Sequence, residues 1–424
     1  MKRISYLILF ALCVSCSGVE PKPLVPPAVE PPQEPGDSTA TIIGARAIRI
    51  SNQSSLLLWR SGLLAFDLFK TVSQKHDKNL FFSPYSMSAA LGMLYNGASG
   101  KTKEEIAKVL RMSDFTPNEV NYYYKELTKA LLEVDPHTSL SLANAIWGNK
   151  DVALKKQFIE LNQGYYDAEI STLDFSLPSA LQTINNWCNN KTNGTIPKVL
   201  EEINPAGLVL LANAVYFKSF WTNRFDESKT VDKPFYNQDS TVSTVSMMHQ
   251  KELELRYFQT DKFSVVILPY ANIAFALFLI LPNEGEDINA LIEELDATSW
   301  RDYLTLRCTT KVTLSMPRFK IEDNLEKLGD ILTALGMESA FSNKADFTSM
   351  LDTEAYLSDF IQRSYISVDE KGTEAASVIL GSLAAGELIP PPEKVTMVVD
   401  RPFAFLIAEQ STATILFMGK VVKL

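Results

Sequence analysis

Histidine and carboxylate side chains are the groups in this sequence that could carry acid–base chemistry. The chain has histidines at His76, His137 and His249 and paired acids at Glu104-Glu105 and Glu201-Glu202. A hydrolase needs such groups beside a nucleophile or a metal, and the sequence has no GxSxG, HExxH, CxxC or phosphate-binding glycine loop. The paired acids fall on predicted polar helix faces or turns, where carboxylates are solvated. We therefore expect no catalytic site, no metal and no cofactor.

A run of small residues near the C-terminus indicates a different function. Val368-Asp369-Glu370-Lys371-Gly372-Thr373-Glu374-Ala375-Ala376-Ser377 is predicted to be a strand that ends in a hinge, and Val378 to Ile389 follow it. In an extended chain Thr373, Ala375 and Ser377 share one uncharged face, and Glu374 and Ala376 lie on the other. That uncharged face could be buried if the segment became a strand. The alternative is a mobile linker before the last strands.

Composition limits the class of protein. The chain has 424 residues, 46% hydrophobic residues and a net charge of −10. This excludes a mostly disordered chain. The acidic balance, without a long Lys/Arg tract, also argues against partners such as nucleic acid or an anionic membrane surface.

The N-terminus predicts export. Residues 1–16 contain Lys2 and Arg3, then apolar residues to Val14, and end at Cys16. This segment resembles a bacterial lipoprotein signal in which Cys16 is acylated, although Cys13 stands where leucine is usual. We expect a protein anchored by lipid in the cell envelope or at the cell surface, with ordinary cleavage and secretion as the alternative. Residues 17–41 are proline-rich and predict an extended tether.

From residue 42 to 424 the sequence indicates one large domain. Helical patterns are expected near residues 57–71, 85–95, 101–111, 118–134, 154–165, 179–191, 288–296 and 324–335. Strands are expected near 139–147, 208–217, 263–269, 274–281, 311–319, 356–369, 395–399, 403–408 and 414–422. This order predicts an α+β fold with large, mostly antiparallel sheets. Cys188 and Cys308 are interpreted as two buried thiols without a bridge.

Several blocks together resemble one family. The stretch Asp369-Glu370-Lys371-Gly372-Thr373-Glu374-Ala375-Ala376 is similar to the reactive-loop hinge of the serpins, a family of protease inhibitors. Asn79-Leu80-Phe81-Phe82-Ser83-Pro84-Tyr85-Ser86, Leu211-Ala212-Asn213-Ala214-Val215-Tyr216-Phe217 and Leu416-Phe417-Met418-Gly419-Lys420 resemble further serpin segments in the same order. The resemblance implies three β-sheets, eight or nine helices and an exposed reactive-centre loop that inserts into the largest sheet after a protease cuts it. It also implies a monomer.

The resemblance implies roles for individual residues. Ser83, Ser86 and Asn213 match the polar cluster that controls opening of the main sheet, and Gln362 stands where the family usually has histidine. Trp221 matches the aromatic residue at the end of the sheet where insertion begins. We expect Glu370 to pair with Arg318 at this end and to gate insertion.

The position of the cut is defined only to a window. Counting forward from Glu370 at the family's spacing predicts the reactive bond Gly386-Glu387, with Ala385 as a neighbouring alternative, whereas counting back from Pro391 gives Leu388-Ile389. The aliphatic and small residues of this window favour an elastase-like serine protease as target, with papain-like or subtilisin-like proteases next. We predict that the protein is a suicide-substrate inhibitor and not an enzyme. The alternative is a non-inhibitory binding or scaffold protein whose loop is merely cleaved.

Overall fold

The structure, a computed structural model, describes residues 47–325, 328–357, 362–373 and 394–424. All of them belong to one compact unit, Glu34–Leu424. The predicted signal with Cys16 and the tether lie outside the described residues. So do the second half of the hinge (Glu374, Ala375, Ala376 and Ser377) and the reactive-bond window that includes Ala385, Gly386, Glu387, Leu388 and Ile389.

Nine α-helices occur in the described residues, which agrees with the expected eight or nine. They are α1 (Asn52–Lys75), α2 (Pro84–Gly97), α3 (Gly100–Val109), α4 (Pro117–Glu133), α5 (Lys156–Tyr166), α6 (Pro178–Lys191), α7 (Ile288–Glu294), α8 (Ala297–Thr305) and α9 (Leu328–Ala334), with short 3₁₀ helices η1 (Glu227–Lys229) and η2 (Ser339–Phe341). As predicted, Ser83 caps α2 and Pro84 occupies its first turn. Gly336, with φ of +109°, follows the end of α9.

The first sheet has six strands. They are β2 (Ser139–Asn149), β3 (Glu169–Leu173), β4 (Val209–Phe220), β10 (Phe319–Leu325), β11 (Gln362–Val368) and β12 (Gly372–Thr373). Their order is β10-β11-β12-β4-β2-β3, and all neighbours are antiparallel except the parallel pair β2 and β3. The two-residue strand β12 therefore separates β11 from β4.

The second sheet has nine strands and joins two of the three sheets that the resemblance implied. They are β1 (Leu80–Phe82), β5 (Val231–Tyr236), β6 (Val242–Gln259), β7 (Phe263–Pro269), β8 (Phe275–Pro282), β9 (Cys308–Pro317), β13 (Lys394–Val398), β14 (Phe403–Glu409) and β15 (Thr414–Val421). The order is β1-β15-β14-β8-β7-β6-β9-β13, with β5 also on β6. The junction is the long strand β6, which pairs with β5 at its start and β7 at its end. A bulge at Glu252, with φ of +53°, bends it between the two halves.

The α+β class is confirmed, but some element boundaries differ from those predicted. The helix expected over residues 324–335 begins only at Leu328, because Phe319–Leu325 is strand β10 and its alternate residues Phe319, Ile321 and Leu325 are buried. The expected burial of both thiols is wrong for Cys308. Both cysteines are free, but Cys308 is exposed at the start of β9 and only Cys188, on α6, is buried.

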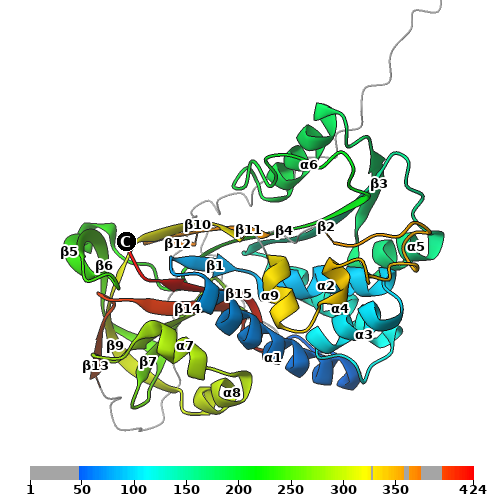
Figure 1. Ribbon diagram of the computed structural model, residues 1–424. Helices are drawn as coiled ribbons and strands as arrows, with labels where there is room; N and C mark the ends of the chain where they lie inside the picture. The colour runs from blue at the N-terminus through cyan, green and yellow to red at the C-terminus, as the bar shows by residue number, and fades with distance from the viewer. Residues whose placement is uncertain (1–46, 326–327, 358–361, 374–393) are drawn as a thin grey trace, which may run out of the picture. The chain divides into compact units, whose positions relative to one another are not determined.

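Helices cover both faces of the six-stranded sheet (Figure 1). On one face, α6 and β2 enclose a small hydrophobic cluster that includes Trp147, Ile184 and Trp187. On the other face, α2 lies between the sheet and β15 in the main core. This arrangement places the ends of β11 and β4, where the predicted hinge begins, beside the second sheet.

Candidate functional site

The first half of the predicted hinge is a tight turn between β11 and β12. The Asp369 amide donates to the Gly372 carbonyl at 3.0 Å, and the Asp369 carboxylate accepts the Lys371 amide at 2.8 Å and the Gly372 amide at 3.2 Å. On the far side of the turn, Gly372 pairs with Phe220, and Thr373 pairs with both Ser219 and Val368. At the start of the hinge, β12 is therefore already paired with β11 on one side and with β4 on the other.

Gly372 is required by close approach of β4. A Cβ atom at this position would lie 2.2 Å from the Ser219 carbonyl oxygen and 2.6 Å from the Phe220 Cα. These are backbone atoms, which cannot rotate away. Only glycine lets β12 lie this close to β4.

Thr373 points into the core, as the alternation in the sequence predicted. The side chain is buried, and its Oγ1 lies 2.6 Å from the hydroxyl of Tyr270. The Tyr270 ring stacks on Trp221 with centroids 4.5 Å apart and 12° between the planes. Burial raises the pKa of Tyr270, so that its phenol stays neutral. The resemblance also covers Ile267-Leu268-Pro269-Tyr270, but sequence reasoning gave Tyr270 no role at the hinge, because its contact with Thr373 spans 103 positions of the chain.

Trp221 holds the turn through the backbone. Its indole Nε1 donates to the Asp369 carbonyl at 2.8 Å, and its amide donates to the Lys371 carbonyl at 2.9 Å. The Phe225 amide donates to the Glu370 carbonyl at 3.0 Å. Trp221 therefore lies where the resemblance placed it, at the end of the sheet next to the hinge.

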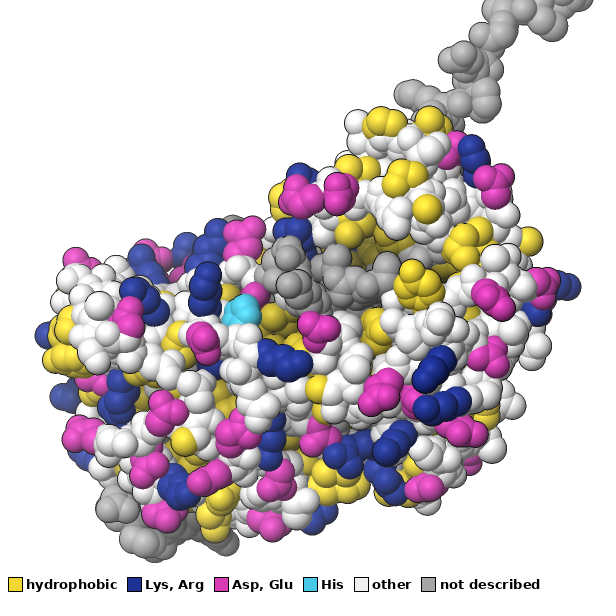
Figure 2. Space-filling model, viewed as in Figure 1, with side chains coloured by type: hydrophobic (Ala, Val, Ile, Leu, Met, Phe, Trp, Pro, Cys, Tyr) yellow, Lys and Arg dark blue, Asp and Glu magenta, His cyan; other side chains and the backbone are white. Residues whose placement is uncertain are grey.

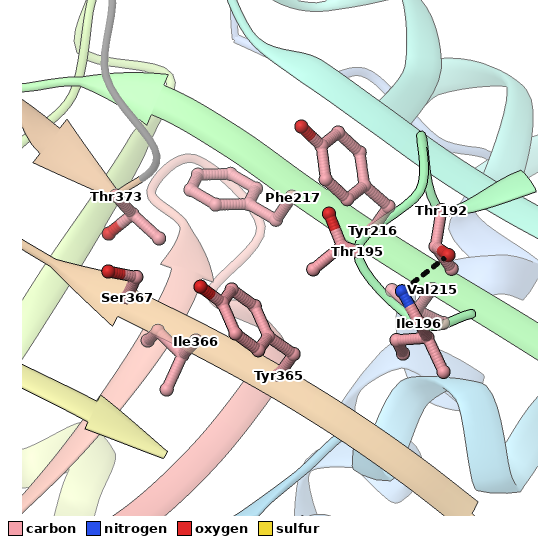
Figure 3. A pocket seen from close by; sticks show the side chains of 10 residues that line it. All are labelled: Thr192, Thr195, Ile196, Val215, Tyr216, Phe217, Tyr365, Ile366, Ser367 and Thr373. Carbon is pink, nitrogen blue, oxygen red and sulfur yellow. Dashed lines mark hydrogen bonds between the residues drawn. The ribbon is translucent and has the colours of Figure 1, made fainter. Parts of the chain in front are cut away.

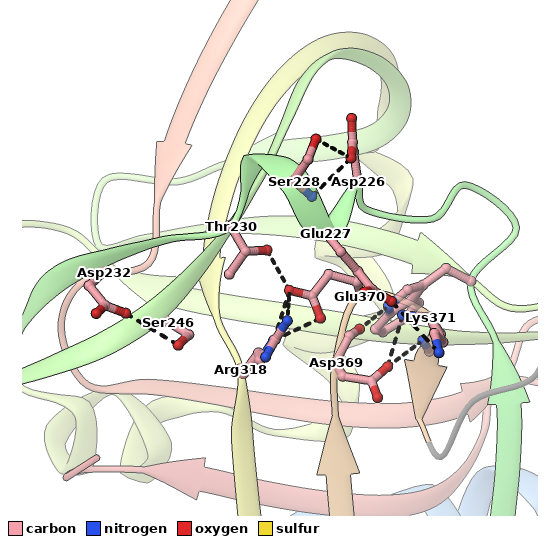
Figure 4. A network of polar contacts seen from close by, with 12 residues as sticks. Asp226, Glu227, Ser228, Thr230, Asp232, Ser246, Arg318, Asp369, Glu370 and Lys371 are labelled. Atoms are coloured by element: carbon pink, nitrogen blue, oxygen red, sulfur yellow. Dashed lines mark hydrogen bonds and ion pairs between the residues drawn. The ribbon is translucent and has the colours of Figure 1, made fainter.

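The expected ion pair between Glu370 and Arg318 is present (Figure 4). Arg318 Nε lies 2.7 Å from both carboxylate oxygens, and the Thr230 hydroxyl donates to Oε1. The side chain of Glu370 is 3% exposed and that of Arg318 is 45% exposed. Burial alone would raise the pKa of Glu370, but the bonds from Arg318 and Thr230 outweigh it, and the pKa lies below its ordinary value.

We expect Glu370→Gln to destabilise the intact protein by about 1–2 kcal/mol at pH 7, because Arg318, which is itself partly exposed to water, loses its buried charged partner. The lowered folded-state pKa means that the carboxylate stabilises the fold above the unfolded-state pKa of about 4.3. This contribution is lost as the pH falls through the lower folded-state pKa. Urea unfolding of both proteins at pH 7 and pH 3 should show a smaller difference at pH 3 than at pH 7. An equal difference at both values would contradict the assignment, and Arg318→Gln is the matched variant.

The predicted sheet-opening cluster divides into two parts. On the β4 side, the Ser86 hydroxyl donates to the Asn213 amide oxygen, and Asn213 Nδ2 donates to Asn144 on β2 at 2.6 Å. On the β11 side, Gln362 accepts the Ser83 amide at 2.9 Å and donates to the Ser83 carbonyl at 3.1 Å. Each strand is thus fastened separately to the start of α2. Among the described contacts, no hydrogen bond joins Gln362 to Asn213.

Below Thr373, no ladder pairs β4 directly with β11 in the described part of the chain. A cavity of about 10 Å³ lies between Tyr216 and Phe217 of β4, Tyr365 and Ile366 of β11, and residues that follow α6 (Figure 3). A larger cavity of about 580 Å³ is lined by the first half of β4, by α2 and by residues 347–357. Figure 2 shows hydrophobic side chains gathered in a hollow on this side of the molecule.

The side chains that could have carried acid–base chemistry lie elsewhere in structural roles. His76 Nε2 lies 3.2 Å from the Asn79 carbonyl, and His249 Nδ1 lies 3.0 Å from the Ser315 hydroxyl. The prediction that the paired acids are solvated is wrong for Glu105, which accepts the Ser339 amide at 2.7 Å and its hydroxyl at 2.9 Å. The described residues contain no cluster of three or more potential metal ligands. None of the described helices has the length and hydrophobicity to cross a membrane.

Comparison with known proteins identifies the family. Residues 61–424 match the model of the family described as serpin (serine protease inhibitor). An uncharacterised serpin-like protein of Thermococcus kodakarensis is 34% identical over 84% of this chain and 83% of its own length. The leukocyte elastase inhibitor of Xenopus laevis is 33% identical over 84% of this chain and 96% of its own length. The chain belongs to the serpin family.

Solved structures agree with this membership. The native state of tengpin, a thermophilic serpin, has a TM-score of 0.79 at 30% identity and covers 90% of this chain and 100% of its own. Human thyroxine-binding globulin complexed with thyroxine has a TM-score of 0.78 at 30% identity and covers 88% of this chain and 99% of its own. Members of this family are generally protease inhibitors, and some are not inhibitory.

Proposed function

We propose that this protein inhibits an endopeptidase as a suicide substrate. The observation that supports it most is β12: Gly372 and Thr373 are already inserted between β11 and β4, and beyond this point no ladder joins these two strands among the residues that the structure describes. A cut downstream of Thr373 would free the chain to continue as a strand between β4 and β11. An inserted strand could then form ladder bonds with both neighbours.

Insertion would trap the protease before it releases the loop. The nucleophile of the target forms an acyl-enzyme with the residue on the N-terminal side of the cut, and water must then hydrolyse it. A strand of about fifteen residues at ~3.3 Å per residue would carry the attached enzyme about 50 Å. Pulling the protease against the far end of the sheet would distort its oxyanion hole, where hydrolysis is catalysed.

We propose an elastase-like serine protease as target. The window of residues 384–389 has aliphatic and small side chains and no Lys or Arg, which suits a shallow apolar pocket. The relative named leukocyte elastase inhibitor supports this choice. Papain-like and subtilisin-like proteases come next.

The first prediction is an SDS-stable complex. Mature protein incubated with an elastase-like protease should give a band at the mass of the protease plus the N-terminal fragment of the inhibitor, and mass spectrometry of the released C-terminal fragment should place the cut within residues 384–389. A trypsin-like protease serves as the control and should give no complex through this window. Complete cleavage without any complex, across elastase-like, papain-like and subtilisin-like proteases, would contradict the proposal.

That contrary outcome would favour a binding function. The similarity to thyroxine-binding globulin, which is described in complex with thyroxine, supports a binding protein as second candidate. An inhibitor holds the protease on its cut loop, whereas a binding protein needs no irreversible trap. The SDS gel of the protein with each protease therefore distinguishes the two functions.

We also propose that Cys16 carries the lipid anchor. The signal-like residues 1–16 and the proline-rich residues 17–41 support this location in the cell envelope. Full-length protein expressed in a bacterial host should incorporate labelled palmitate, and Cys16→Ser should abolish the label. Equal labelling of the wild type and of Cys16→Ser would show that Cys16 does not carry the lipid.

A further inference from the structure

The larger cavity has a buried apolar interior. Its volume of about 580 Å³ lies within the range of about 300–1,000 Å³ that is typical of small-molecule sites. Ala90 and Leu94 of α2 line it together with Met350 and Leu351, and each of these four residues is at most 3% exposed. The first half of β4 forms a further wall. The apolar body of a small organic molecule therefore fits the interior.

The outer rim of the same cavity carries negative charge and an aromatic ring. Glu202, Glu354 and Tyr356 line the cavity and are exposed, Tyr356 to 62%. Within the described part of the chain neither carboxylate has an ion-pair partner, whereas the neighbouring Glu201 pairs with Lys198. The described lining residues include no Lys, Arg or His. The rim therefore favours a cation, and an aromatic face beside the carboxylates attracts a cation as well.

The cavity also reaches the two strands that flank β12. Its lining includes Leu211 and Asn213 of β4 and Gln362 of β11. An inserted strand that continues β12 antiparallel to β11 would run from Val368 toward Gln362 and enter the same space. A molecule bound in the cavity and an inserted strand would therefore exclude each other.

The charge of the rim argues against the loop of a second copy as the occupant. Residues 374–389 contain Glu374 and Glu387 and no Lys or Arg. An acidic loop placed against Glu202 and Glu354 would bring like charges together. A small molecule with a positive charge has the complementary chemistry.

We propose that this cavity binds a small organic cation with an apolar body, and that the bound cation competes with insertion of the cut loop. The apolar interior receives the body, and the ammonium or guanidinium group lies at the rim with Glu202, Glu354 and the Tyr356 ring. The binding site is independent of the inhibitory function. The competition rests on that proposed function.

Three probes that share a decyl chain and differ in the head group test the site. Decylammonium, decanol and decanoate are titrated into the intact mature protein at pH 7 by isothermal calorimetry, below the concentrations at which they aggregate. One decylammonium ion should bind per chain, about tenfold more tightly than decanol, since two exposed carboxylates attract it. Decanoate should bind more weakly than decanol.

Variants assign this preference to the rim. Glu202→Gln and Glu354→Gln should each weaken decylammonium binding about two- to fivefold and leave decanol binding unchanged, as for the loss of a water-exposed charge pair. Glu293→Gln is the matched control, because Glu293 is an exposed carboxylate on α7 that does not line the cavity. It should change neither affinity.

A third kind of variant fills the cavity. Ala355 lines it from a segment that is neither helix nor strand, and Ala355→Trp should abolish binding of all three probes. The melting curve of Ala355→Trp shows whether it is folded, and the two glutamate variants test the site if it is not.

Competition with the loop is measured on the SDS-stable complex. Saturating decylammonium should lower the fraction of protease that the wild type traps by at least about twofold. The same concentration should have a smaller effect on the double variant Glu202→Gln/Glu354→Gln. The activity of the protease on a small peptide substrate in the same buffer shows that the probe does not inhibit the protease itself.

The outcomes separate the claims. Equal affinity for the three probes, or an equal loss of decylammonium binding in Glu293→Gln, would overturn the cation site. Wild-type dimers in sedimentation velocity that decylammonium does not dissociate would assign the cavity to a second copy and overturn it as well. If decylammonium binds as expected and trapping is unchanged, the competition is overturned and the inhibitory function stands. If the wild type traps no protease even without the probe, the inhibitory function fails, and selective binding of decylammonium still supports the site.

Discussion

We expect cleavage within residues 384–389 to raise the melting temperature of this protein by more than about 10 °C. For a domain of this size, about 2 °C corresponds to 1 kcal/mol, so the cleaved form must be more stable by at least about 5 kcal/mol. This rise in melting temperature requires no substitution in the sequence. It follows if the cut loop inserts between β4 and β11, which share no ladder in the described residues of the intact chain.

The source of this free energy lies in the sheet more than in the loop. Ordering each loop residue costs about 1–2 kcal/mol of backbone entropy, and each new ladder bond returns about 0.5–1.5 kcal/mol net. These contributions nearly cancel. We expect the surplus to come from completing the sheet below Thr373, where an inserted strand would pair with β4 and β11 and add contacts to the side chains that line the 580 Å³ cavity.

Calorimetry of intact protein and of protein cleaved by a non-target protease measures this difference. The two halves must remain associated after the cut, which native gel electrophoresis shows. A cleaved form that melts within about 3 °C of the intact form would mean that no insertion occurs. The proposed trap would then lack its driving force.

The sequence predicted the fold class because its strongest signals are local. Ser83-Pro84 starts α2 where expected, since capping and the fixed φ of proline need no tertiary partner. Strand β5 was missed because Pro234 interrupts it, and an edge strand tolerates proline. Helix α8 was also missed, although Asp296 caps it by accepting the Thr298 and Ser299 amides. That N-cap was the signal that could have found it.

The candidate site was predictable only in part, for a related reason. Glu370 and Arg318 were paired by resemblance, and they do pair. Tyr270 and Asn144 contribute equally specific contacts, but each reaches a partner far along the chain, and no spacing in the sequence encodes that contact. Gln362 contacts Ser83, another residue of the expected cluster, but it does so through the Ser83 backbone, a contact that the type of side chain at position 83 does not reveal.

We expect Thr373→Arg to convert the protein from an inhibitor of its target protease into a substrate. Thr373 is 2% exposed, and its hydroxyl bonds that of Tyr270 in the core. A guanidinium at this position would have to lie against Tyr270 and Trp221 without a carboxylate partner, and burying an unpaired charge costs several kcal/mol. The arginine would destabilise β12, the paired start from which the inserted strand must extend, so we expect insertion to slow and hydrolysis of the acyl-enzyme to win. We expect the number of inhibitor molecules consumed per protease trapped to rise more than tenfold.

Thr373→Val and Thr373→Ser separate charge from hydrogen bonding. Valine keeps the shape and loses the hydroxyl, and serine keeps the hydroxyl, so both should trap protease with a stoichiometry within about threefold of the wild type. The cleaved Thr373→Arg protein should also lose the rise in melting temperature, since the same insertion produces both effects. Unchanged trapping by Thr373→Arg would show that this face of the hinge is not buried during inhibition, and the alternation that places Thr373 against Tyr270 would then have no functional consequence.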